Sequence, residues 1–70
     1  MKYDINFDVY CSCLDSNTLI NYMKKCVLNC GGKFDYVKEG FLRHHITFYI
    51  TIEEKYKNAI LRAYTDLQWL

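Results

Sequence analysis

The sequence predicts a single α+β domain with the element order β-α-β-β-α, and three observations support this. Apolar and polar residues alternate without a break over residues 3–13, which is typical of a strand with one buried face. Apolar residues recur at helical spacing in two separate segments, residues 16–30 and 53–68. Between these segments lies a second alternating region that is interrupted at Gly40. Seventy residues are enough for one small domain of this kind.

The first predicted helix has recognisable start and stop signals. Residues 15–17 (Asp-Ser-Asn) are all good N-cap residues, because their side-chain oxygens can accept hydrogen bonds from free backbone N–H groups. The apolar periodicity ends just before residues 31–32, which are both glycine. Glycine adopts the left-handed conformation that closes many helices without strain. We therefore expect the helix to cover about residues 16–30.

Two further strands and a helix are expected in the second half of the chain. Residues 33–37 and 41–51 read as strands, and residues 38–40 (Lys-Glu-Gly) fit a three-residue hairpin loop with glycine in the left-handed position. Thr51 and Glu54 match a capping box, in which each side chain caps the backbone of the other. The second helix is therefore expected to begin directly after the third strand.

These elements predict a three-stranded antiparallel sheet in the order 1-3-2, with both helices on one face. A right-handed crossover from the first strand to the second leaves a slot between them, and the third strand fills it from the hairpin. The topology resembles a ferredoxin-like fold that lacks its fourth strand, and this resemblance covers the whole chain. The outer edge of the first strand, residues 3–13, would then be unpaired. Such an edge recruits a strand from a second copy or from another protein unless it is blocked.

Adjacent histidines in the third strand suggest a metal site, but strand geometry argues against one. Neighbouring side chains on a strand point to opposite faces, so His44 and His45 cannot ligate one ion. His44 shares the parity of the predicted core residues and should point toward the helices, with a carbonyl near the end of the first helix as its partner. His45 should point to the open face of the sheet.

The open face is the first candidate binding surface. The hairpin loop predicts Val37 opposite Phe41 and Asp35 opposite Arg43, and matching the inner faces predicts Asp8 opposite His45. An Asp–His pair beside an arginine could act as a general base, but opposite charges also occur on sheet faces for solvation alone. We expect no catalytic residue. The predicted open-face contacts are Asp8, Tyr10, Asp35, Phe41, Arg43, His45 and Tyr49.

A second candidate surface lies at the end of the second helix. Arg62 and Trp69 fall on the side of the helix opposite its apolar stripe. Arginine and tryptophan are enriched in protein interaction hot spots. The alternative is that Trp69 folds back onto the core.

The four cysteines are expected to be free thiols. Cys11 and Cys13 end the first strand, whereas Cys26 and Cys30 lie near the far end of the first helix. Ten helical residues span about 15 Å, so the four sulfurs cannot share one zinc ion at bonding distance. All four have core parity and should pack as small apolar groups. We expect no metal and no cofactor, with zinc and a disulfide as the alternatives.

Charge and composition bear on the choice of partner. Nine Lys/Arg against eight Asp/Glu give a net charge of +1, without the basic excess typical of nucleic-acid binding. The first residues show no apolar signal segment, and no stretch approaches a membrane span, so a cytoplasmic location is expected. Abundant Lys, Ile, Asn and Tyr and the absence of Pro suggest an AT-rich genome, as in many phages.

Together these features predict a small non-enzymatic interaction protein that occludes a partner protein. We expect a homodimer formed through the first-strand edge or the open face. A phage-type accessory or inhibitor protein, for example an anti-defence protein of the anti-CRISPR kind, would fit. A nucleic-acid-binding domain that uses the open face is the alternative.

Overall fold

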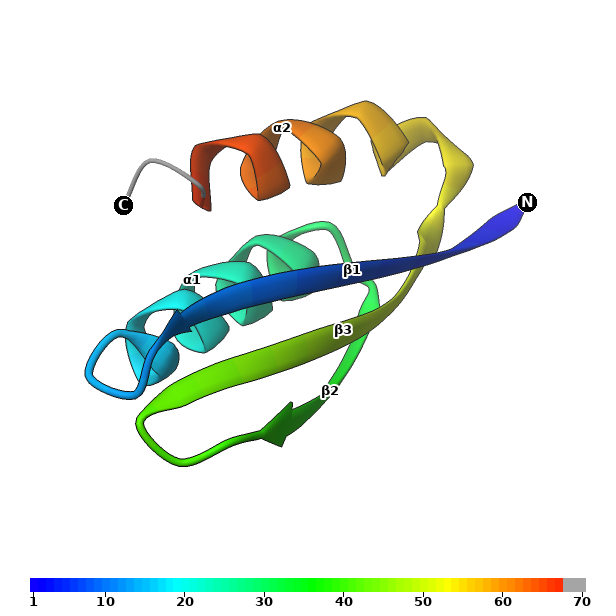
Figure 1. The fold of residues 1–70 in the computed structure, drawn as a ribbon. Coiled ribbons are helices and arrows are strands. Elements are labelled where there is room, and N and C mark those ends of the chain that lie inside the picture. Colours follow the sequence, from blue (N-terminus) through cyan, green and yellow to red (C-terminus); the bar gives the residue numbers. More distant parts are fainter. Residues whose placement is uncertain (68–70) are drawn as a thin grey trace.

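Three strands and two helices form a two-layer structure in the computed structural model, which describes residues 1–67 (Figure 1). The order of elements confirms the predicted α+β arrangement, and a short 3-10 turn precedes the second helix. The elements are β1 (Lys2–Ser12), α1 (Ser16–Asn29), β2 (Lys33–Glu39), β3 (Arg43–Glu53), η1 (Glu54–Tyr56) and α2 (Lys57–Leu67).

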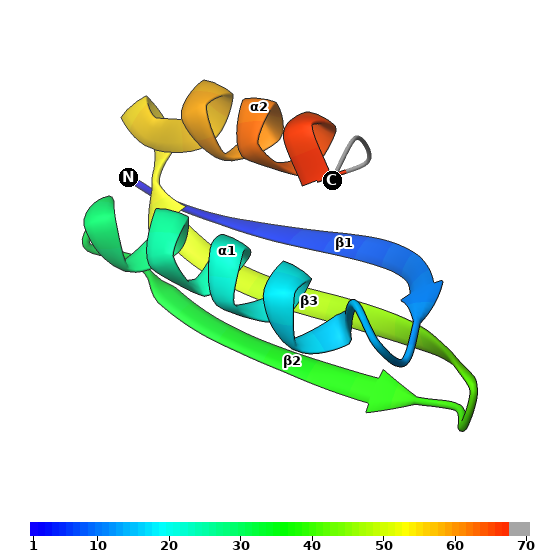
Figure 2. The ribbon, with the colours of Figure 1, turned by 90° about the vertical axis from the view of Figure 1, so that its left-hand side faces the viewer.

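The sheet has the predicted order β1-β3-β2, with antiparallel neighbours. Both helices lie on the same side of it, α1 over β3 and β2 and α2 beside β1 (Figure 2). The other side of the sheet, which we call the open face, is uncovered by any element in residues 1–67. Within the same range no strand pairs with the outer edge of β1.

The core lies between the sheet and the helices. Odd-numbered residues of β1 and even-numbered residues of β3 point inward, so that Ile5 lies opposite Ile50 and Phe7 opposite Phe48. Helix α1 contributes the fully buried Met23. Neither α1 nor α2 is long and apolar enough to cross a bilayer. The buried apolar residues are Ile5, Phe7, Cys11, Leu19, Ile20, Met23, Val27, Ile46, Phe48, Ile50, Ile52, Ile60, Ala63 and Leu67.

The register between β1 and β3 differs from the predicted one by two residues. Val9 lies opposite Ile46 and not opposite His44. The ladder extends over the full length of both strands, and backbone bonds from Cys13 N–H to the Leu42 carbonyl (2.9 Å) close one end of it. Because the shift is an even number of residues, every side chain keeps its predicted face.

The hairpin between β2 and β3 also differs from the prediction. β2 continues to Glu39, so Val37 lies opposite Thr47 and Phe41 belongs to the loop. The tight turn depends on Gly40, whose φ is 108° and whose α-carbon lies so close to the Arg43 carbonyl that a Cβ would stand 2.1 Å from its oxygen. A side chain is excluded at this position both by space and by backbone conformation.

The start of the second helix needs correction, whereas α1 begins at the predicted residue. Thr51 remains inside β3 and donates to Asp4 Oδ1 (2.7 Å), so it caps no helix. Glu53 occupies the cap position of η1 instead, with extended backbone angles. At α1, Asp15 occupies the cap position but its side chain makes no capping hydrogen bond. The end of α1 is as predicted, because Gly31 adopts a φ of 72°.

Candidate open-face interaction site

Asp8 is the centre of a hydrogen-bonded cluster on the open face. The Nε2 atom of His45 and the Oγ1 atom of Thr47 each lie 3.0 Å from Asp8 Oδ1. An ionised carboxylate only accepts hydrogen bonds, so His45 carries its proton on Nε2 here. These bonds lower the pKa of Asp8 below its ordinary value, with the bond from His45 as the larger cause and that from Thr47 the next. Asp8 is therefore held as a carboxylate.

An aromatic ring covers one side of this cluster. Tyr10 lies directly opposite His45 in the sheet, and the two rings stack with centroids 4.6 Å apart and planes within 9°. Tyr10 is nevertheless 70% exposed, and Tyr49 and Val37 on the same face are also exposed. Exposed apolar groups beside a fixed polar cluster are typical of interaction surfaces. The Tyr10–His45 stack was not predicted, because it depends on the true register.

Three other predicted contacts are separated from the Asp8 cluster or from each other. Arg43 lies opposite Ser12, so it pairs with neither Tyr10 nor Asp35 as the predicted registers required. Asp35 lies opposite Tyr49 on the far side of β3, and its Oδ1 accepts the backbone N–H of Tyr36 (2.8 Å). Phe41 is 87% exposed in the hairpin loop. Asp8, Tyr10 and His45 of the predicted set form one compact group, and Arg43 lies beside it, because it lines the same depression as Tyr10 and His45.

The second candidate surface is distinct from the open face. Arg62 is exposed on α2, and α2 lies on the opposite side of the sheet. Trp69, which the sequence placed beside it, lies outside the described residues. Arg62 and the Asp8 cluster therefore lie on different sides of the sheet.

The open face carries an excess of carboxylates. Its side chains come from even-numbered residues of β1 and odd-numbered residues of β2 and β3, since residues of the other parity are on the side of the sheet that the helices cover. Three of these residues are Lys or Arg, namely Lys2, Lys33 and Arg43. Five are acidic, namely Asp4, Asp8, Asp35, Glu39 and Glu53. Such a face repels phosphate groups and attracts a basic surface.

His44 points inward, as predicted, but its partner is different. Its Nδ1 atom is hydrogen-bonded to the hydroxyl of Ser16 at the start of α1, and not to a carbonyl at the end of that helix. Ser16 is 1% exposed, and its hydroxyl also lies 3.3 Å from the Ser12 carbonyl and 3.7 Å from Cys11 Sγ. A buried serine of this kind joins α1 to two strands and is closed to substrates. We assign this group a structural role.

All four cysteines are free thiols in the structure. Cys11 is buried, and Cys13, Cys26 and Cys30 are partly exposed. Within residues 1–67 no group of three or more His, Cys, Asp or Glu side chains is arranged to hold a metal ion.

The Asp8–His45 pair has the composition of a general base, but its surroundings suit binding better. Its side chains are 63% and 37% exposed on a flat sheet. His45 lines a shallow depression of about 340 Å³ together with Tyr10 and Arg43, and Asp8 lines a larger, partly open cavity of about 620 Å³. Electrostatic catalysis depends on a site that excludes water. The hydrogen-bonding groups and aromatic rings of this cluster are fixed in place and can contact the surface of a partner.

Comparison with protein-family models, with curated proteins and with solved structures gave no match. Function therefore has to be inferred from the geometry of the site.

Proposed function

We propose that the protein is a small non-enzymatic interaction module that binds and occludes a partner protein through the open face. The observation that carries this proposal is the Asp8 cluster. Asp8, His45 and Thr47 are fixed by mutual hydrogen bonds, and Tyr10 is stacked upon them while remaining largely exposed. Ordering these side chains before binding reduces the entropy that association must overcome.

The partner that suits this face is a protein with a basic contact surface. Five acidic side chains against three basic ones disfavour phosphate backbones, so a nucleic-acid ligand is the weaker candidate. Exposed tyrosine supplies apolar area and a hydroxyl at low entropic cost, as in many protein interfaces. An inhibitor that covers its target in this way needs no catalytic group.

We also propose that the protein forms a homodimer. The open face could be self-complementary, because it carries both signs of charge. A symmetric dimer formed through the open face would compete with partner binding. Dimer formation depends on the concentration of the protein itself, so the two processes can be distinguished by varying that concentration. Sedimentation of the purified protein over a range of concentrations tests dimer formation.

A pull-down from cells of the native source, analysed by mass spectrometry, tests the proposal. The bait is the wild-type protein beside two variants, Tyr10→Ser on the open face and Lys24→Ala on the exposed side of α1. We expect a captured protein that is present with wild type and Lys24→Ala and depleted with Tyr10→Ser. Equal capture by all three baits would contradict the use of the open face.

A further inference from the structure

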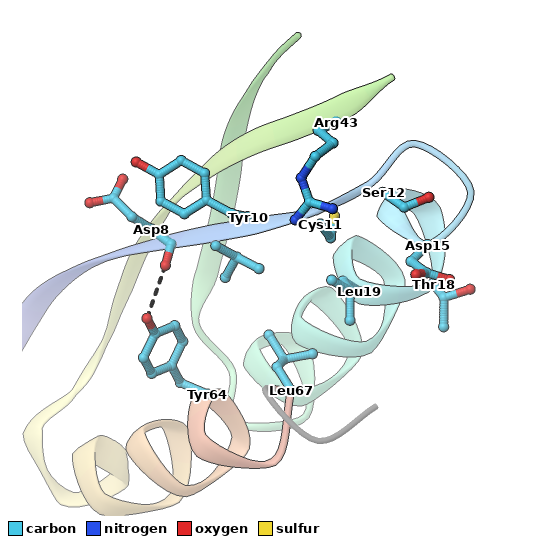
Figure 3. A pocket seen from close by; sticks show the side chains of 11 residues that line it. Asp8, Tyr10, Cys11, Ser12, Asp15, Thr18, Leu19, Arg43, Tyr64 and Leu67 are labelled. Atoms are coloured by element: carbon cyan, nitrogen blue, oxygen red, sulfur yellow. Dashed lines mark hydrogen bonds between the residues drawn. The ribbon is translucent and has the colours of Figure 1, made fainter. Parts of the chain in front are cut away.

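The outer edge of β1 offers backbone groups of known direction. The Asp8 carbonyl accepts the Tyr64 hydroxyl (2.9 Å) and so points away from β3 (Figure 3). Cys13 N–H bonds to the Leu42 carbonyl on the β3 side. Since these directions alternate along an antiparallel strand, the even-numbered residues of β1 direct both N–H and C=O outward. Within residues 1–67, the only outward carbonyls of β1 with a hydrogen-bonding partner are those of Asp8 and Ser12.

A cavity adjoins this edge at the Tyr10 end of the strand. It has a volume of about 620 Å³ and lies between β1, the start of α1 and the end of α2 (Figure 3). Leu19 from α1 and Leu67 from α2 point toward it, and Val9 of β1 lines it as well. The space is large enough for several side chains, and its lining combines these apolar groups with polar ones, among them Asp15, Thr18 and Arg43.

We infer that an extended segment of the partner protein adds to this edge as a fourth strand and inserts apolar side chains into the cavity. This inference rests on the proposed function and specifies a contact beside the open face. An added strand gains affinity from backbone hydrogen bonds and specificity from pockets for alternate side chains. The β1 edge supplies the backbone groups, and the cavity supplies the pocket.

The charges beside the edge define the other side of the incoming strand. Asp4 and Asp8 lie on the open face of β1, and every side-chain hydrogen bond they accept within residues 1–67 ends on Oδ1. Each Oδ2 can accept a further bond. Cross-strand pairs of opposite charge stabilise a sheet. The partner strand should therefore alternate apolar residues, facing the cavity, with basic residues, facing Asp4 and Asp8.

The same carboxylates make a basic strand a better occupant than a second copy of β1. Antiparallel pairing of two β1 strands about Asn6 would place Asp4 opposite Asp8 of the second copy, and pairing about Asp8 would place two Asp8 carboxylates together. Like charges that are directly opposite destabilise a strand pair. Pairing about Phe7 avoids this by placing Asp4 opposite Tyr10 and Asp8 opposite Asn6, but it forms no ion pair with either carboxylate.

The probe is an acetylated, amidated heptapeptide of alternating valine and lysine, added to the isotope-labelled full chain and followed by NMR. We expect amide shifts centred on Tyr10, Thr18 and Leu19. Two N-methylated peptides serve as controls, one with the valine amides blocked and one with the lysine amides blocked. Only one alternate set of amides faces β1, so one methylation should weaken binding at least about tenfold and the other should be tolerated.

Tyr64→Phe provides a matched protein variant. It keeps the ring stacked on Phe7, where the centroids are 4.2 Å apart, and removes the hydroxyl that occupies the Asp8 carbonyl. Freeing this acceptor should tighten peptide binding by about two- to tenfold. A chain that ends at Leu67 should bind the peptide as the full chain does.

Four results with the peptide would overturn the inference. The first is that the peptide does not bind at millimolar concentration, and the second is that both methylated peptides bind equally well. The third is that the NMR shifts are confined to His45 and Thr47. The fourth is that the chain that ends at Leu67 binds the peptide with a much higher affinity than the full chain. The third result would leave the proposed function intact, because the open face would still bind. A dimer whose outward β1 amides are protected from exchange would assign the edge to a second copy and would also overturn it.

Discussion

His45 Nε2 lies 3.0 Å from Asp8 Oδ1, although these residues are diagonal neighbours in the sheet. Asp8 is directly opposite Thr47, and His45 is directly opposite Tyr10. The carboxylate thus receives one hydrogen bond from across the ladder and one from the diagonal, while Tyr10 stacks on the imidazole. Four side chains from two strands are fixed as a unit on an otherwise uncovered face.

This unit predicts an acid titration for Asp8 below its ordinary range. The folded pKa is lowered, so the stabilisation is fully present above the unfolded value of 3.8 and is lost as the pH falls through the folded pKa. NMR titration of the side-chain carboxyl should show a midpoint under 3.8 that rises in His45→Ala and in Thr47→Val. An Asp8 midpoint that is unchanged in both variants would show that these bonds are absent in solution.

Ser16→Ala should destabilise the fold. The substitution removes the buried hydroxyl that bonds to the half-buried ring of His44, and the loss of such a hydrogen bond costs about 1 kcal/mol. Asn17→Ala, in the same turn of α1 but exposed, should change the free energy of unfolding by less than about 0.5 kcal/mol. Urea unfolding of the two variants measures the difference. Equal stabilities would mean that the Ser16–His44 contact contributes little.

The two glycines after α1 should differ in their tolerance of alanine. A Cβ on Gly32 would stand 2.6 Å from Ile52 Cγ2 and 2.7 Å from the Thr51 carbonyl, whereas one on Gly31 would meet nothing within 4 Å. Gly31→Ala costs only the strain of a left-handed residue, about 1–2 kcal/mol. Gly32→Ala should cost more, because backbone and core must both move. Thermal unfolding of the two variants measures the difference in stability. A larger loss of stability for Gly31→Ala than for Gly32→Ala would contradict the packing described.

The thiols should react in two classes with a thiol reagent such as DTNB. Cys13, Cys26 and Cys30 are partly exposed and should react quickly in the folded protein, whereas Cys11 is 8% exposed and should react only on unfolding. Reaction of all four at one rate would contradict this burial. Counting the thiols in denaturant under non-reducing conditions gives the total, and fewer than four would indicate a disulfide.

Side-chain parity could be predicted from the sequence, whereas the registers could not. Alternation of apolar residues decides which face His44 and His45 take, and both faces were right. A register depends on where a turn closes. The loop between β2 and β3 lies at residues 40–42 and not at 38–40, and Asp35 lies opposite Tyr49, so the predicted Arg43–Asp35 pair does not form. The register between β1 and β3 differs from the prediction by only two residues, so the Asp8–His45 contact persists between diagonal neighbours.

Other parts of the site depend on contacts between distant segments. The hydroxyl of Tyr64 reaches the Asp8 carbonyl only because α2 runs beside β1. The place of Tyr64 in the apolar stripe of α2 could be predicted from the sequence, but its hydrogen bond at the sheet edge could not. Likewise, the Ser16–His44 bond joins residues 28 positions apart, and neither residue carries a local signal for it.

The most direct test of partner binding through the open face is calorimetric titration of the captured partner with three proteins. These are the wild type, Tyr10→Ser on the open face, and Arg62→Ala on the exposed side of α2. We predict that Tyr10→Ser raises the dissociation constant at least about tenfold, as expected for an aromatic interface residue, and that Arg62→Ala leaves it unchanged. Loss of binding with Arg62→Ala and full binding with Tyr10→Ser would contradict the proposed function.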